Sequence, residues 1–214
     1  MVYLFLLSIV LIYLVSEKVL YRRRLRLVPL RIHVNGTRGK TTVACLTAEL
    51  LRRAGIRTLA KTTGDHPVLI LPDGRPMPIR RRGPARIHEQ MRIVRRAARE
   101  GAQAVVLECM ALEPHLQEVC EQAMVCSSIG VITNVRPDHF EVMGGGLDGV
   151  ANALSRTIPN GGALVTESGP YAGMFRERAG ARGAAVCVAE AARPLTGGGA
   201  ADPILLENLA LVRA

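Results

Sequence analysis

A short glycine-containing segment, residues 35–42 (NGTRGKTT), joins an apolar run at 30–34 to an amphipathic stretch at 41–54. Its two glycines permit a tight turn and a close approach of backbone N–H groups to a bound anion. A helix that begins directly after such a turn points the positive end of its dipole at the same anion. The segment therefore predicts a phosphate-binding loop between a strand and a helix, which places the chain among the α/β folds.

The side chains of this loop suit a nucleotide. Lys40 is placed to reach the β- and γ-phosphates, and the Thr41 hydroxyl to ligate Mg²⁺. The common loop pattern GxxxxGK[ST] would have glycine at position 34, where this chain has Val34. A chance glycine turn is the alternative, but Lys40 is one of only three lysines among 28 basic residues. The candidate nucleotide-binding residues of the loop are Asn35, Gly36, Thr37, Arg38, Gly39, Lys40, Thr41 and Thr42.

Apolar runs alternate with helical patterns along the rest of the chain. Strands are expected at 30–34, 56–60, 104–107, 129–133, 163–165 and 184–188. Helices are expected at 41–54, 87–100, 114–124, 147–157 and 171–179, with a last helix from about Pro203. Residues 61–86 are rich in proline and glycine and are expected to be loop-rich. Six strand signals separated by helices predict a doubly wound, mostly parallel sheet.

The N-terminus predicts a membrane anchor. Within residues 1–15 only Ser8 is not hydrophobic, and the first charge is Glu17. Sixteen uncharged residues would form a helix about 24 Å long, and Val19–Tyr21 extends it toward the roughly 30 Å of a bilayer's hydrocarbon core. A secretory signal peptide would carry positive charge before the run and small residues after it; a buried core helix is the other alternative. We expect one transmembrane helix over 1–21, a basic linker over 22–29 and the main domain over 30–214.

The net charge of +10 is unevenly distributed. Residues 18–31 carry six basic side chains and no acid, and residues 75–99 carry nine arginines against Glu89 alone. Arginines at 22–24 directly follow the apolar run, so the positive-inside rule places the main domain in the cytoplasm of a single-pass membrane protein. We interpret this charge as a contact for anionic lipid headgroups and expect no nucleic-acid partner. The five cysteines form no CxxC pair and no cluster with histidine, which fits a reducing compartment.

Two further segments, together with the loop, carry a resemblance to a known family. Residues 36–42 (GTRGKTT) are similar to the GTxGKT loop of the Mur ligase family, the ATP-dependent amide-forming ligases of peptidoglycan synthesis, in which this shorter glycine spacing is the rule. Residues 105–108 (VVLE) end a buried strand on a carboxylate, and residues 133–139 (TNVRPDH) are similar to the family's TN-x-x-x-DH signature. The resemblance implies ATP and Mg²⁺ as cofactors and an ATP-binding P-loop domain of the Mur-ligase central type over 30–214.

The resemblance also assigns roles to individual residues. It implies that Glu108 and His139 join Thr41 as Mg²⁺ ligands, and that Lys40, Glu108 and His139 are the catalytic residues. It places Asn134 beside the nucleotide. Carboxylate oxygens suit a hard cation, and a neutral imidazole can complete such a site. A structural acid that caps the next helix is the alternative for Glu108.

Within the family, a membrane segment followed by a basic stretch and the loop resembles the membrane-anchored, capsule-type poly-γ-glutamate synthases. Only residues 1–34 precede the loop, too few for the UDP-sugar-binding domain that precedes it in the peptidoglycan ligases. Residues 61–64 (KTTG), 108–111 (ECMA) and 138–144 look like that group's motifs, which makes candidate substrate contacts of Lys61, Thr62, Thr63 and Asp138.

The reaction implied by this resemblance activates the γ-carboxylate of glutamate with ATP. The resulting acyl phosphate is attacked by the amine of another glutamate, which gives an amide of a poly-γ-glutamate chain. The implied partners are glutamate, the polyglutamate chain and the membrane subunits of a complex for polymer synthesis and export. Another membrane-anchored P-loop ATPase or kinase, or a nucleotide-binding module without chemistry, is the alternative.

Two segments remain open to interpretation. The arginines of 75–99 either bind the polycarboxylate product or are a solvated helix face, on which Arg92, Arg95, Arg96 and Arg99 have the spacing of exposed residues. Residues 207–210 (ENLA) look like the family's asparagine-led helix near the adenine, with Asn208 as the candidate contact. Because the chain stops at Ala214, within that helix, we expect the domain to be incomplete at its C-terminus and the ligase activity of these residues alone to be weak or absent.

Overall fold

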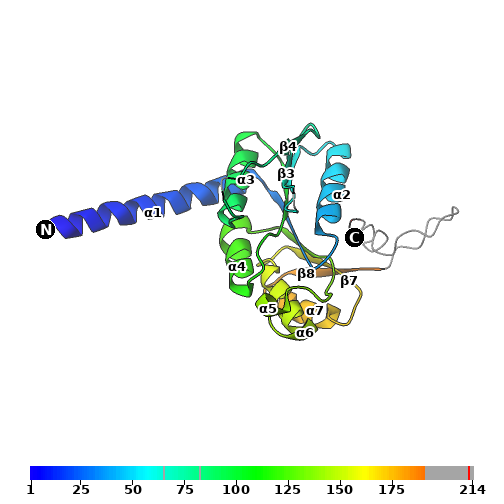
Figure 1. Ribbon diagram of the computed structural model, residues 1–214. Coiled ribbons are helices and arrows are strands. Elements are labelled where there is room, and N and C mark those ends of the chain that lie inside the picture. The colour runs from blue at the N-terminus through cyan, green and yellow to red at the C-terminus, as the bar shows by residue number, and fades with distance from the viewer. Residues whose placement is uncertain (65, 82, 191–211, 213–214) are drawn as a thin grey trace.

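The structure, a computed structural model, describes residues 1–64, 66–81, 83–190 and 212 (Figure 1). Its α-helices are α1 (Val2–Leu27), α2 (Lys40–Arg53), α3 (His88–Arg99), α4 (Pro114–Val119), α5 (Phe140–Met143), α6 (Gly146–Leu154) and α7 (Ala172–Ala181). A π-helical turn η1 (Cys120–Val125) and a 3₁₀ turn η2 (Ser155–Thr157) extend two of them. The strands are β1 (Leu30–Asn35), β2 (Thr58–Lys61), β3 (Val68–Ile70), β4 (Pro76–Pro78), β5 (Ala104–Glu108), β6 (Ile129–Ile132), β7 (Ala163–Glu167) and β8 (Ala185–Ala189).

The strands form one sheet in the order β4-β3-β2-β5-β1-β6-β7-β8. In the part β2-β5-β1-β6-β7-β8 of this order, all neighbouring strands are parallel. The pairs β2–β3 and β3–β4 at the other end are antiparallel. Helices cover both faces, with α2 on the side opposite to α3 and α4 (Figure 1). The prediction of a doubly wound, mostly parallel sheet is confirmed.

Side chains alternate between the two faces along the buried central strands, as strand geometry requires. Val106 of β5 packs in a cluster with Val43 and Ala48 of α2. Its neighbours Val105 and Leu107 point the other way, into a cluster with α3. Both faces are buried, which explains why β5 reads as a continuous apolar run rather than as an alternating one.

The loop-rich segment 61–86 contains two short strands that the sequence did not predict, β3 and β4, which form an antiparallel hairpin. Each strand has only three residues, and β4 begins and ends with proline. A proline cannot donate a hydrogen bond to a sheet, so it normally marks the end of a strand. At the outer edge of the sheet this donor is not needed, and Pro76 and Pro78 are accommodated in β4.

The N-terminal helix α1 extends well past the expected boundary at residue 21 and projects from the body (Figure 1). It is long and apolar enough to cross a membrane, and none of its apolar window is buried, which argues against a core helix. The stretch expected as a basic linker continues the same helix to Leu27. The predicted anchor and the main domain are therefore joined by helix rather than by a loop.

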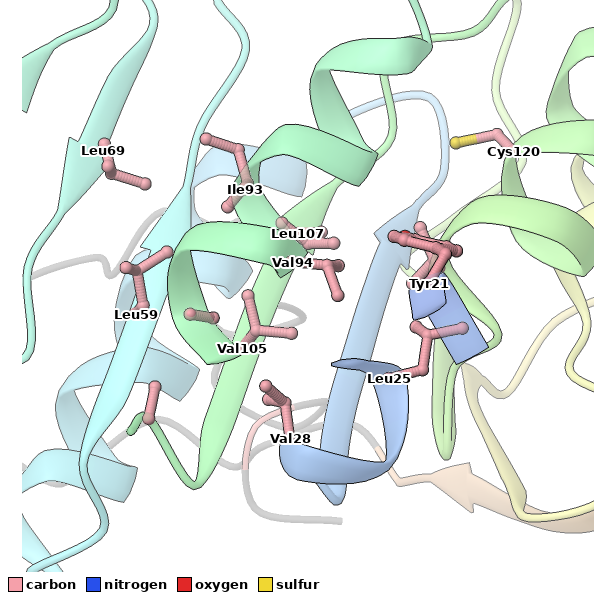
Figure 2. Close-up of a cluster of buried hydrophobic side chains, with 13 residues drawn as sticks. Tyr21, Leu25, Val28, Leu59, Leu69, Ile93, Val94, Val105, Leu107 and Cys120 are labelled. Atoms are coloured by element: carbon pink, nitrogen blue, oxygen red, sulfur yellow. The ribbon is translucent and has the colours of Figure 1, made fainter. Parts of the chain in front are cut away.

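The base of α1 is part of the core. Tyr21, Leu25 and Val28 are buried among side chains of α3 and β5 (Figure 2). Arg31 of β1 caps the C-terminal end of α1. Its guanidinium donates to the carbonyl oxygens of Leu25 at 3.1 Å and of Val28 at 2.8 Å. A guanidinium at this position also opposes the negative end of the helix dipole.

Two expectations fall on the C-terminal part of the chain. The last helix from about Pro203 and the candidate adenine contact Asn208 lie outside the described residues.

Candidate functional site

The polar motifs converge because they end four neighbouring strands of the sheet. In the parallel register Val34 pairs with Glu108, Asn35 with Ile132, and Lys61 with Leu107. The carboxyl ends of β2, β5, β1 and β6 therefore lie at one edge, where open α/β sheets bind their ligands. The edge brings together Lys61, Glu108, the glycine loop and Thr133.

The glycine loop has a conformation that only glycine adopts easily. Gly36 has a φ of 131°, and a Cβ atom there would lie 2.0 Å from Oγ1 of Thr133. Gly39, with a φ of 80°, is left-handed and begins α2. The backbone must therefore turn twice within four residues, and the first turn packs directly against the end of β6.

Asn134 fixes the shape of the loop. Its Oδ1 accepts hydrogen bonds from the Thr37 hydroxyl at 2.6 Å and from the Arg38 N–H at 3.0 Å. Its Nδ2 donates to the Arg38 carbonyl oxygen at 3.2 Å, and Thr133 Oγ1 donates to the same oxygen at 2.6 Å. The asparagine that was expected beside the nucleotide thus uses its side chain to hold the loop.

Asn35 is also engaged within the protein. Its Nδ2 donates to Gln117 at 2.8 Å and to Thr157 at 3.1 Å, and its Oδ1 accepts from the Gly36 N–H at 2.9 Å. Only 3% of the residue is exposed. The side chain of Asn35, one of the predicted nucleotide contacts, therefore anchors the end of β1 within the protein.

Thr41 and Glu108 meet at the mouth of the loop. The Thr41 hydroxyl lies 3.1 Å from Oε1 and 3.0 Å from Oε2 of Glu108. The Thr63 N–H donates to Oε2 of Glu108 at 2.8 Å, which brings a third predicted residue to the same carboxylate. The Lys40 ammonium donates to the carbonyl oxygens of Gly36 at 2.8 Å and Thr37 at 3.2 Å, so it lies back across the loop.

Lys61 is fully buried and forms a charged cluster next to this site. Its ammonium lies 3.1 Å from Glu89, whose carboxylate also accepts two hydrogen bonds from Arg81 at 2.9 Å. Burial lowers the pKa of Lys61, against the opposing charge of Glu89. Burial would raise the pKa of Glu89, but the Arg81 hydrogen bonds and the Lys61 charge outweigh it, so that the pKa is lowered.

Thr62 and Asp138, two more of the expected substrate contacts, lie beside the site and contact different elements. Thr62 is buried and exchanges hydrogen bonds with the backbone of Val68, which starts the β3 hairpin. Asp138 lies 3.9 Å from the guanidinium of Arg38 on the other side of the glycine loop.

His139 stands apart from the other predicted metal ligands. It has a left-handed backbone with a φ of 38°, and its side chain is 46% exposed. Its described contacts are with Asp138 at 3.7 Å and Glu141 at 3.2 Å. In the described structure, therefore, Thr41 and Glu108 contact each other and His139 contacts neither.

The donor set nevertheless fits a magnesium ion. Within residues 1–64, 66–81 and 83–190 there is no cluster of three or more histidine, cysteine or acidic side chains that would hold a metal alone. Magnesium commonly binds one or two protein oxygens and takes its other ligands from substrate phosphates and water. The hydroxyl of Thr41 and the carboxylate of Glu108 supply such oxygens directly beside the phosphate loop.

A cleft of about 310 Å³ opens at this edge. Residues of the loop (Asn35, Gly36, Lys40), of the segment after β2 (Thr63, Gly64), of the segment after β5 (Cys109–Leu112), and Arg81, Ala85 and Met143 line it. Sequence reasoning missed Glu89 and Gln90, whose amide donates to the Glu108 carbonyl oxygen at 2.9 Å and whose Oε1 accepts from Lys61 at 3.3 Å. Glu89 carried a signal, since it is the only acid among nine arginines, whereas Gln90 carried none.

Two curated relatives align with most of this chain. It is 37% identical over 186 residues to the PGA synthase CapB of Bacillus subtilis (strain 168) and 40% identical over 185 residues to the capsule biosynthesis protein CapB of Bacillus anthracis. The alignments cover 86% and 85% of this chain, but 47% and 40% of the relatives. The chain thus spans less than half the length of these relatives.

The fold also has a counterpart among solved structures. The bifunctional folylpolyglutamate synthase/dihydrofolate synthase of Yersinia pestis, solved with AMPPNP and a Mn ion, matches with a TM-score of 0.63 and 17% identity. The match covers 92% of this chain and 57% of that one. In sequence, residues 34–190 match the Mur ligase middle domain, from the last apolar residue before the glycine loop to the end of β8. The chain belongs to the Mur ligase family.

Proposed function

We propose that this chain is the ATP-binding part of an amide ligase of poly-γ-glutamate biosynthesis. It would activate a glutamate γ-carboxylate as an acyl phosphate for attack by the amine of another glutamate. The observation that carries the proposal is the contact of Thr41 with Glu108 at the mouth of the glycine loop, in a chain 37–40% identical to two capsule-type relatives. The family uses ATP and a divalent metal ion, and the relative solved with AMPPNP and a Mn ion has this fold.

The residues of this chain would act by binding and positioning. The backbone amides of the loop and the Lys40 ammonium would hold the phosphates, once Lys40 exchanges the carbonyl oxygens of Gly36 and Thr37 for them. Thr41 and Glu108 would hold the magnesium ion, which supplies positive charge to the transferred phosphoryl group when it is bound. Phosphoryl transfer depends mainly on such positioning and charge neutralisation. The Asn134 hydrogen bonds keep the loop in shape before ATP arrives.

The substrate carboxylate would bind on the side of the cleft formed by Thr63, Gly64 and Arg81. Arg81 lines this side of the cleft, and beside its two hydrogen bonds to Glu89 its guanidinium has further N–H groups that could donate to a carboxylate. Lys61 is fully buried beneath the residues that line the cleft. It would therefore act on the substrate through the charge of its cluster rather than by contact. Asp138 and His139 lie across the loop and would contact groups bound there.

The same proposal includes a location and partners. Residues 1–21, which include most of α1, would cross the membrane once, with the sheet domain in the cytoplasm and the arginines at 22–24 against anionic headgroups. The membrane subunits of a polymer synthesis and export complex would then be the neighbours of α1.

ATP binding with and without Mg²⁺ tests the proposed site. In the full chain held in detergent or nanodiscs, Thr41→Val and Glu108→Gln should each weaken Mg²⁺-dependent ATP binding by at least about tenfold and leave Mg²⁺-free binding nearly unchanged. Thr47→Val, two turns further along α2, is the matched control and should bind like the parent chain. Equal Mg²⁺-dependent affinity in all three variants would contradict the assignment.

Turnover separates the proposed ligase from the alternatives. ADP formation should depend on added glutamate, and hydroxylamine should trap the activated carboxylate as a hydroxamate. ADP formation at the same rate without glutamate would instead indicate another P-loop ATPase or kinase. Tight ATP binding without any ADP formation would indicate a module without chemistry.

A further inference from the structure

Arginines line a second cavity, about 460 Å³ in volume, between the β3–β4 hairpin, α3 and the base of α1. Among the residues that the structure describes, no acidic side chain lines it. Apolar residues of β3, β4 and α3 form its floor, including Leu69, Met77 and Ile93. Its basic residues are Arg24, Arg80, Arg92, Arg95, Arg96 and Arg99.

A third hollow lies between this cavity and the cleft of the candidate site, and it has lining residues in common with both. An adjoining cavity of about 690 Å³ shares Ile79, Arg80 and Arg92 with it and extends to Arg81. Arg81 in turn lines the cleft that contains Lys40. The three hollows thus follow one another from the phosphate loop to α1, and we call the surface that they line the arginine path; the arginines common to neighbouring hollows are Arg80, Arg81 and Arg92. The middle hollow is also lined by Glu89, which is paired with Arg81 and Lys61.

The charges of the arginine path are mostly left unpaired. Among the described residues no acid lies within 4.0 Å of Arg24, Arg80, Arg92 or Arg99, whereas Arg95 pairs with Glu17 and Arg96 with Glu100. Other arginines of this domain share acids: Arg52 and Arg53 both contact Glu49. Like charges gathered around one hollow repel one another, and an anion bound there would relieve this repulsion. The arrangement is therefore that of a binding surface for a polyanion.

The far end of the path lies at the end of the apolar run. The Arg95 guanidinium is 2.7 Å from Glu17, the first charged residue after that run, and 5.6 Å from the ring centre of Tyr21. These contacts hold α3 beside α1 where α1 leaves the body (Figure 1). An anion that follows the path away from the phosphate loop thus arrives at the base of the predicted anchor.

We infer that the arginine path binds an extended polycarboxylate, namely the γ-linked glutamate chain, and leads it from the cleft toward the membrane. The inference rests on the proposed function, because amide formation through the γ-carboxylate leaves one free carboxylate on every residue. A guanidinium pairs with a carboxylate through two parallel hydrogen bonds, so successive arginines match successive carboxylates. A lipid headgroup would fill only the end near Arg24, and it would not account for the continuation to Arg81.

Binding of a defined oligomer tests the path. The probe is a fluorescent γ-linked glutamate decamer, titrated with the full chain in nanodiscs of neutral lipid and followed by anisotropy. The double variant Arg80→Gln/Arg92→Gln should weaken decamer binding by more than about tenfold and leave ATP–Mg²⁺ affinity unchanged. The double variant Arg53→Gln/Arg176→Gln removes the same charge from α2 and α7 and should change decamer binding by less than about twofold.

Three results would overturn the path. The first is equal weakening of decamer binding in both double variants, which would show only an effect of net charge. The second is no decamer binding by a parent chain that still binds ATP–Mg²⁺ and forms ADP with glutamate, which would leave the proposed function standing. The third is an unchanged decamer affinity in Arg80→Gln/Arg92→Gln together with a lost preference for phosphatidylglycerol over phosphatidylcholine vesicles, which would assign the arginines to lipid.

Discussion

The glycine loop and the Lys61 cluster lie on opposite sides of one cleft and are held by different forces. The loop is held by hydrogen bonds between neutral groups, most of them from Thr133 and Asn134. The cluster is held by three charges, those of Lys61, Glu89 and Arg81. Neutral hydrogen bonds tolerate changes of pH and salt, whereas a charge cluster holds only while every member keeps its charge. One side of the site should therefore keep its shape when the other is disturbed.

The largest effect is expected from the loop's steric contact. In Gly36→Ala, the new methyl group would lie 2.0 Å from Thr133 Oγ1 at a φ of 131°. We expect a loss of about 3 kcal/mol or more in unfolding free energy and no detectable ATP binding. Urea unfolding and ATP titration measure both. Gly64→Ala, in the same cleft with nothing within 4 Å of its Cβ, should be nearly silent; comparable losses in both would refute the steric explanation.

A smaller effect is expected in the charge cluster. Glu89→Gln removes the partner of buried Lys61 and of Arg81, and should cost about 2 kcal/mol of unfolding free energy at pH 7. The loop is held independently, so ATP affinity should fall by no more than about threefold. Glu177→Gln, at an exposed position of α7, is the control for removing one acid. A loss of ATP binding as large as that in Gly36→Ala would show that the two sides are not independent.

Loss of the Asn134 side chain should lower the unfolding free energy less than Glu89→Gln does. Asn134→Ala removes the acceptor of Thr37 and Arg38 and one donor to the Arg38 carbonyl oxygen. We expect about 1.5 kcal/mol of destabilisation and about tenfold weaker ATP binding. Asn134→Asp keeps the acceptor and should recover part of the affinity. If Asn134→Ala binds ATP like the parent chain, the asparagine does not preorganise the loop.

The smallest effect is expected in how the unfolding free energy depends on pH. The pKa of Glu89 is lowered in the folded chain, so its contribution to stability is present above its usual pKa and is lost as the pH falls through the folded value. The parent chain should therefore lose stability more steeply than Glu89→Gln as the pH falls below about 5, and the difference in unfolding free energy between the two chains should shrink. Parallel unfolding curves over this range would mean that Glu89 does not carry the charge assigned to it.

The sequence predicted the centre of the molecule better than its edges. The glycine loop, Glu108 and the 133–139 segment were placed correctly at neighbouring strand ends, because buried parallel strands and a glycine turn leave strong local patterns. The β3–β4 hairpin was missed, because Pro76 and Pro78 mark a strand end everywhere except at the edge of a sheet.

Partners across the sheet were beyond prediction from the sequence. Asn134 was expected beside the nucleotide, and only the loop's folded position shows that its amide bonds Thr37 and Arg38. The partners of Lys61 lie 28 and 29 residues away on α3, and no periodicity of that helix points to them. The convergence of Arg24 with Arg92 and Arg99 likewise depends on how α1 enters the core.

That entry of α1 into the core has a mechanical consequence. Because Tyr21, Leu25 and Val28 are core residues, α1 is a rigid stem and not a tether. Anything that binds the projecting part of α1 therefore also sets the orientation of the sheet, and of the cleft at its edge, relative to itself. The packing of α1 in the core removes the rotation of the sheet domain relative to α1. A molecule that binds both α1 and the sheet domain would therefore not have to pay the entropy of restricting that rotation. A helix-breaking insertion at the base of α1 would therefore release the orientation of the sheet from that of the projecting helix without changing the cleft.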